Sequence, residues 1–156
     1  MITYFNSRTD VHNPSFKSEE DIVHLIKEDE EIANQVRAVR LAHRVYLNEK
    51  NQERQIEKKK EKDELKGNLP GFVVAGEFTS RNNKSCLQYH ARIIVDIDHY
   101  EEFEKLKHKV KNDNTVLMAF VSPSGDGLKI VHKLDDPEIE KDELIDFHKQ
   151  AFQNLE

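Results

Sequence analysis

Apolar positions follow helical spacing through the first part of the chain. Ser18 precedes three acidic residues and an apolar stripe at positions 22–26, which predicts a helix with a hydroxyl cap and acids at its positive end. A second stripe, with steps of three and four, predicts a helix that packs on the core through Ile32, Val36, Val39, His43 and Tyr46. From Asn48 to Lys66 the stripe almost disappears although most residues favour helix, which indicates a charged, solvated helical arm that can be partly disordered.

The pattern changes at residues 67–71, where glycine and proline interrupt the helix and strand-like runs begin. Strands are then expected at 72–78, 92–97, 115–121 and 128–134, with helices at 100–110 and 144–155. This order contains most of a split β-α-β unit of the ferredoxin-like type, without its last strand. The predicted fold is therefore α+β, with an N-terminal helical extension at 1–66 and a core at 67–156. Its sheet either is incomplete at the C-terminus or is completed by the 72–78 strand.

Composition limits the classes of protein that fit this pattern. The 156 residues suit one compact unit, and their formal net charge of -6 means that any nucleic-acid contact requires a local basic patch. The single cysteine, Cys86, excludes an internal disulfide framework and fits a reducing compartment. The N-terminus has no signal-peptide pattern, and no run approaches the ~20 apolar residues of a membrane span, so a cytoplasmic protein without membrane contact is expected.

Two carboxylates, Asp96 and Asp98, close a mostly apolar run that begins at Ala91. Side chains two residues apart on a strand point to the same face, so both carboxylates can converge on one cation while Ile97 points into the core. Hard oxygen ligands of this kind suit Mg2+ or Mn2+. The alternative interpretation is that the acidic residues simply end the strand and that Asp98 caps the helix expected near Tyr100.

A glycine-rich segment follows the next strand, and it contains the candidate phosphate-binding residues Ser122, Ser124, Gly125, Gly127 and Lys129. The glycines permit backbone conformations closed to other residues and let amides face an anion, while the serine hydroxyl and the lysine add polar contacts. The segment is not a Walker loop, because the Gly-Lys-Ser/Thr ending before a helix is missing. The alternative interpretation is a hairpin connection, in which Pro123 fixes φ and Gly-Asp-Gly makes the bend.

Two histidines are candidates for auxiliary roles. His90 comes just before the carboxylate strand and His132 lies on the strand after the glycine-rich segment, so either could assist a site at the same end of the sheet. Isolated histidines are also common as ordinary polar or core residues. The histidines of this chain are too scattered for a zinc cluster, and Cys86 has no adjacent partner for thiol catalysis.

Several of these residues occur together, in the same order, in one known family. The segments that match are Leu69-Pro70-Gly71-Phe72, Gly76-Glu77-Phe78, His90, Asp96-Ile97-Asp98 and the run from Ala119 to Lys129. Together they resemble the N-terminal domain of virulence-associated-E-like proteins, a branch of the archaeo-eukaryotic primase superfamily that is often fused to a helicase or another replication module of mobile elements. The resemblance covers roughly the whole chain, with the charged arm as an expanded insertion, and it implies an RRM-like, primase-type sheet.

The resemblance also implies roles for individual residues. Asp96 and Asp98 correspond to the first primase motif, whose carboxylates hold catalytic metal ions, here Mg2+ or Mn2+. Residues 124–129 correspond to the second motif, where many primases have a histidine and this chain has Lys129, a cation suited to phosphate rather than to proton transfer. Relatives continue into a third motif with an acidic residue and an arginine, whereas this sequence stops at Glu156. We therefore expect nucleotide and metal binding, with little or no polymerase activity from this chain alone.

Three functions follow as hypotheses. The first is a primase-polymerase-like domain of a mobile-element or phage replication protein, which binds a nucleoside triphosphate and a divalent metal and has DNA and a helicase as partners in the parent protein. The second is a non-catalytic nucleic-acid-binding or docking module for a helicase, although an aromatic content of 8% offers few stacking platforms. The third is a helical adaptor in which the charged arm contacts another protein.

Overall fold

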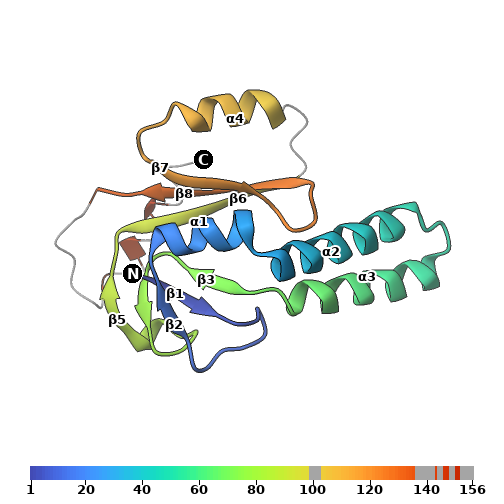
Figure 1. The fold of residues 1–156 in the computed structure, drawn as a ribbon, viewed down its shortest axis with the longest axis horizontal. Coiled ribbons are helices and arrows are strands. Elements are labelled where there is room, and N and C mark those ends of the chain that lie inside the picture. The colour runs from blue at the N-terminus through green and yellow to red at the C-terminus, as the bar shows by residue number, and fades with distance from the viewer. Residues whose placement is uncertain (99–102, 136–142, 144–145, 148–149, 152–156) are drawn as a thin grey trace.

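The structure is a computed structural model that describes residues 1–98, 103–135, 143, 146–147 and 150–151. The chain forms helices and antiparallel sheets, with the helices and strands in separate groups along the sequence, which confirms the predicted α+β class (Figure 1). The elements in order are β1 (Ile2–Phe5), β2 (Ser15–Lys17), α1 (Glu19–Glu28), α2 (Glu30–Asn48), α3 (Gln52–Gly67), β3 (Gly71–Val73), β4 (Gly76–Phe78), a 3-10 turn (Asn83–Ser85), β5 (Cys86–Tyr89), β6 (Arg92–Asp98), α4 (Phe103–Lys111), β7 (Val116–Val121) and β8 (Gly127–Lys133).

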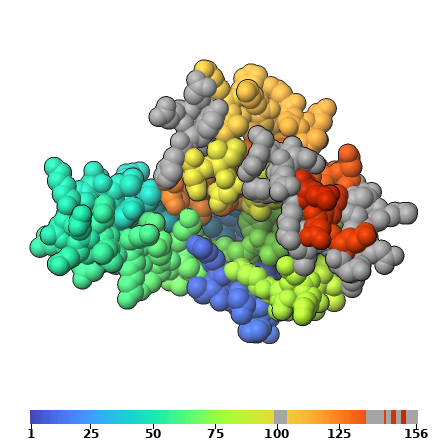
Figure 2. Space-filling view, turned by 180° about the vertical axis from the view of Figure 1, so that it is seen from behind, coloured from blue at the N-terminus to red at the C-terminus, as the bar shows by residue number. Residues whose placement is uncertain are grey.

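The three N-terminal helices form where the sequence predicts them. The Ser18 cap and the apolar stripes predict the first two, and helix-favouring residues predict the third. Ser18 and Asp21 form a reciprocal capping box at α1, in which each side chain accepts a hydrogen bond from the other residue's backbone N–H. These bonds hold the pKa of Asp21 below its ordinary value. Most of the charged arm forms α3, which packs against α2 as an antiparallel hairpin that projects from the rest of the molecule (Figures 1 and 2).

The strands of the second half form a three-stranded sheet in the order β6-β8-β7. Because β8 is antiparallel to both neighbours, β6 and β7 run parallel to each other and are joined through α4. Two parallel strands joined through α4, with the antiparallel β8 between them, form a split β-α-β arrangement. The expected start of α4 near Tyr100 and most of the expected helix at 144–155 lie outside the described residues.

The expected 72–78 strand is wrong as a single element. The chain turns at Val74 and Ala75, so that β3 pairs with β1 and β4 pairs with β5. The turn places the Val74 side chain in the core, and the Ala75 carbonyl accepts a hydrogen bond from the His90 amide. Neither half of the segment pairs with β6, so the segment does not complete the β6-β8-β7 sheet.

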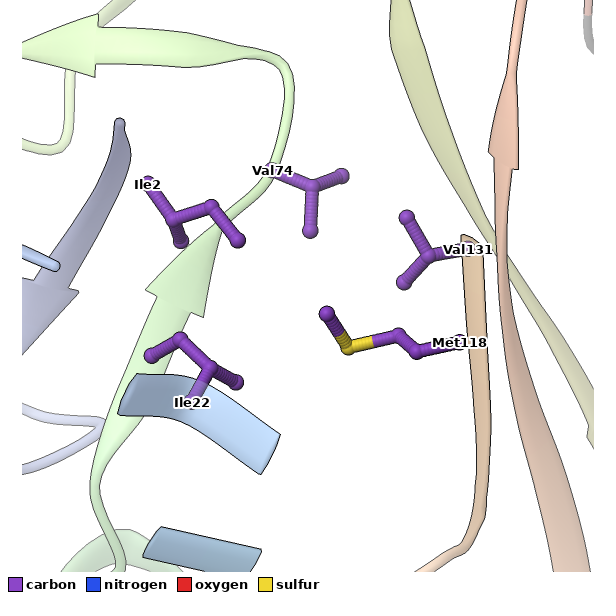
Figure 3. Close-up of a cluster of buried hydrophobic side chains, with 5 residues drawn as sticks. All are labelled: Ile2, Ile22, Val74, Met118 and Val131. Atoms are coloured by element: carbon purple, nitrogen blue, oxygen red, sulfur yellow. The ribbon is translucent and has the colours of Figure 1, made fainter. Parts of the chain in front are cut away.

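The core joins the N-terminal residues to this sheet. Figure 3 shows Ile2, Ile22 and Val74 on one side of this core. They face Met118 and Val131, which lie on the β6-β8-β7 sheet. All five side chains are buried, and Ile2 is only 1% exposed. Residues on both sides of the predicted boundary at 66 and 67 therefore share one core. Over the described ranges, no helix has an apolar stretch of the length needed to cross a bilayer.

Candidate functional site

Asp96 and Asp98 lie at the end of β6, on one face of its sheet. The antiparallel register pairs Asp96 with Lys129 and Asp98 with Gly127 across the β6–β8 ladder, and directly paired residues share a face. Ile97 alternates to the opposite face, where α4 packs and residues such as Val110 and Ala119 line a common cavity. Both carboxylates are exposed, so their oxygens can reach a ligand from solvent.

Lys129 forms an ion pair with Asp96, in which its Nζ contacts Oδ2 of the carboxylate. The side chain of Lys129 is 23% exposed and that of Asp96 is 48% exposed, so water partly screens the pair. On its other side, Lys129 pairs in register with Phe120 of β7. A row of carboxylate, ammonium and aromatic ring thus crosses the three strands.

The glycine-rich segment is a closed hairpin loop that hydrogen bonds to itself. Ser122 is only 3% exposed, and its hydroxyl accepts a hydrogen bond from the Gly127 amide at 3.1 Å. The Gly125 amide donates to the Ser122 carbonyl at 2.9 Å, and Gly125 has a φ of 90°, which a side chain would disfavour. Two amides proposed to face an anion are therefore used within the loop, as the hairpin interpretation predicts. The candidate phosphate contacts that remain in this segment are the half-buried Ser124 and Lys129.

Gly127 permits the close approach of the two strands at the carboxylate end. A Cβ atom at this position would lie 2.8 Å from Oδ1 of Asp98 and 2.8 Å from the carbonyl oxygen of Ile97. The carboxylate can move away, but the backbone carbonyl cannot do so without a shift of β6. The absence of a side chain at Gly127 therefore allows Asp98 to lie this close to β8.

Replacing Gly127 with alanine is expected to lower the free energy of unfolding by about 1 to 3 kcal/mol, because the methyl group overpacks against β6. Chemical denaturation measures the loss, and amide NMR shifts at Asp98 report the displacement. Gly67→Ala is the matched control, since its added methyl would meet only the Thr9 side chain at 3.3 Å. Equal stabilities for the two variants would contradict the close approach.

Helix α2 contributes two side chains to the loop that the sequence did not single out as site residues. Arg40 lies against Gly125, where an added Cβ would be 3.4 Å from the Arg40 Nε. His43 is buried, and its Nε2 lies 3.0 Å from Oδ2 of Asp126. Within the described part of the chain, the buried Nε of Arg40 and Nδ1 of His43 have no hydrogen-bond partner. The sequence feature that could have pointed to Arg40 and His43 is their spacing of three residues, which places a cation and a histidine on the core-facing side of an amphipathic helix.

The two candidate histidines are not brought to the carboxylates. His132 pairs with Ile93, five residues before Asp98, which is roughly 16 Å along a strand. His90 precedes β6 and contacts Glu77, whose Oε1 also pairs with the N-terminal ammonium at 3.2 Å. The hydrogen bond from His90, followed by that from the N-terminus, holds the pKa of Glu77 below its ordinary value. Both histidines therefore belong to the other end of the sheet.

The residues present can contribute two carboxylates to a cation. Mg2+ commonly takes one or two protein carboxylates and completes its coordination with water and substrate phosphates, so Asp96 and Asp98 fit that mode. Among the described residues, no group of three or more His, Cys, Asp or Glu side chains is placed to hold a metal. Residues 99–102, on which the alternative role of Asp98 as a helix cap depends, lie outside the described part.

Comparison with known proteins identifies a family for this chain. The sequence model of the BT4734-like N-terminal domain family matches residues 64–156, more than half of the chain. The match begins close to the helix break at 67–71 and includes all three strands of the β6-β8-β7 sheet. Neither a curated protein nor a solved structure matches.

Proposed function

This chain belongs to the family of BT4734-like N-terminal domains, and we propose that it binds a nucleoside triphosphate together with Mg2+ or Mn2+. In this proposal the domain is a primase-polymerase-like module of a mobile-element or phage replication protein. Asp96 and Asp98 hold the metal, while Ser124 and Lys129 contact the phosphates. DNA and a helicase are the partners of the parent protein.

The observation that supports this proposal is the grouping of opposite charges at one end of one sheet face. Two exposed carboxylates lie beside Lys129, and the glycine-rich loop follows directly from the neighbouring strand. A metal ion bound by the carboxylates would neutralise phosphate charge, and the lysine ammonium would contact a phosphate oxygen. Carboxylates alone would repel a triphosphate, so the metal and Lys129 together determine whether the anion can approach.

Binding of CTP in the presence and absence of Mn2+, measured by isothermal titration calorimetry, tests the proposal. Asp96→Asn and Asp98→Asn are each expected to weaken Mn2+-dependent binding by about tenfold or more, since a charge-assisted contact is lost. Without Mn2+, Asp96→Asn should not weaken binding, because Lys129 loses its partner and becomes available to phosphate. Asp63→Asn removes the same charge from the exposed surface of α3 and is the control.

Two results would contradict this proposal. Absence of CTP binding by the unmodified chain would remove the nucleotide role. Equal Mn2+-dependent affinities for the unmodified chain and both aspartate variants would remove the metal role while leaving nucleotide binding in place.

A second candidate function is a metal-independent module that binds single-stranded nucleic acid. The Lys129–Asp96 ion pair favours it, since one carboxylate already has a cation beside it. Single-strand affinity should then fall steeply between ~50 and ~200 mM salt and should decrease in Lys129→Met without any dependence on Mn2+. Absence of binding at low salt would exclude this alternative.

A further inference from the structure

An apolar pocket lies next to the glycine-rich loop, between α1, α2, β1, β3 and the end of β7. Its volume is about 160 Å³, and its walls include the aromatic rings of Tyr4, Phe72 and Phe120. Phe72 and Phe120 lie 5.8 Å apart between ring centroids. Pro123 of the loop and Arg40 of α2 also line it. We propose that this pocket binds the base of the nucleotide, an inference that rests on the proposed function.

The size of the pocket suits one planar ring. A cavity of about 150 Å³ with comparable apolar walls is large enough to hold benzene. Drug-sized ligands need pockets of roughly 300 Å³ or more, so a larger apolar molecule would not fit. Aromatic walls favour a flat π-system over an aliphatic chain, because they allow stacked and edge-on contacts.

Arg40 supplies a cation at the pocket wall. The side chain is half-buried, and its Nε atom is buried without a hydrogen-bond partner among the described residues. A desolvated guanidinium is costly unless an anion compensates it. The carboxylate of the neighbouring loop residue Asp126 pairs with His43, so the Arg40 guanidinium can contact the anionic part of a ligand.

The pocket is connected to the proposed phosphate site through Phe120. This residue lines the pocket and also pairs in register with Lys129, which contacts Asp96. Directly paired strand residues have Cβ atoms only about 5 Å apart. A nucleotide can therefore place its ring against Phe120, one phosphate near Arg40 and the remaining phosphates near Lys129. A ligand with a ring and no anion, or an anion and no ring, would use only half of these contacts.

The test compares CTP, whose base is a single six-membered ring, with inorganic tripolyphosphate, both with Mn2+ and by calorimetry. The unmodified chain is expected to bind CTP roughly tenfold to a hundredfold more tightly, the usual range for a stacked base. Val36→Phe, which adds a ring to the pocket wall, should reduce CTP affinity to that of tripolyphosphate and leave tripolyphosphate affinity unchanged. Val45→Phe, on the same helix, 43% exposed and not among the residues lining the pocket, should change neither.

A second filling variant, Ile26→Phe, replaces a pocket residue that is 39% exposed, and it provides the same test should Val36→Phe not fold by circular dichroism. Arg40→Met should weaken CTP binding about tenfold, whereas Arg37→Met, an exposed residue on the same helix, should not. Unchanged CTP affinity in a folded filling variant, or equal affinities of the unmodified chain for CTP and tripolyphosphate, would overturn the base pocket alone. Failure of the unmodified chain to bind either probe would overturn the proposed function as well.

Discussion

Replacing Phe5 with alanine is expected to lower the free energy of unfolding by about 3 to 5 kcal/mol, the usual cost of removing a fully buried aromatic ring. Phe5 is 0% exposed and lies on β1, the central strand of the β2-β1-β3 sheet. The Arg81 guanidinium lies 4.6 Å from the centre of its ring, so the substitution also removes a cation–π contact. The resulting cavity would lie beside Gly71, the residue paired with Phe5, which has no side chain to fill it.

Urea denaturation followed by circular dichroism measures this loss. Phe16→Ala is the matched control, because Phe16 lies on β2 of the same sheet but is 39% exposed. We expect its cost to be well under half of that for Phe5. Similar small losses in both variants would mean that the first residues are an appendage instead of part of the core.

Thr3→Val should be the second most damaging single change, at about 1 to 3 kcal/mol for each buried group left without a partner. The Thr3 side chain is nearly isosteric with valine, so the loss would be almost purely one of hydrogen bonds. Its hydroxyl donates to the Gly76 carbonyl at 2.7 Å and accepts from the Phe78 amide at 2.9 Å. It thereby joins β1 to β4, which belongs to a different sheet.

Differential scanning calorimetry would show the effect as a lower Tm, and hydrogen exchange at the Phe78 amide would locate it. Thr9→Val is the control, since the Thr9 side chain is exposed and its hydroxyl contacts the Ser7 hydroxyl at 3.1 Å. A Phe78 amide that stays as protected as in the unmodified chain would show that water or another group replaces the threonine hydroxyl.

Local patterns were sufficient for the three N-terminal helices and for β6, β7 and β8. The Ser18 cap and the stripe from Ile32 to Tyr46 depend on neighbours three or four residues away, and both helices form as predicted. By contrast, β1 was not predicted, because four residues give little periodicity and its partner β3 is more than 60 residues away. The turn at Val74 was not predicted for a similar reason, because the burial of Val74 against Met118 and Val131 is a tertiary contact.

In the candidate site, too, local features could be predicted from the sequence and long-range contacts could not. Alternation along β6 was enough to place Asp96 and Asp98 on one face. Sequence could not reveal that Lys129 contacts Asp96, since that depends on the register of two strands joined through β7. Nor could it show that α2 brings Arg40 to the glycine-rich loop, because the two lie more than 80 residues apart and their contact requires the folded chain.

The α2–α3 hairpin leaves the folded core and returns to it at nearly the same place (Figure 1). Its tip lies between the cap residues Glu49 and Asn51, and Lys50 between them is exposed. Exposed loop tips of this kind tolerate inserted sequence, since no buried backbone hydrogen bond depends on them. Lys50 is therefore a suitable position for a fluorescent reporter or an immobilisation tag, attached without interrupting any strand.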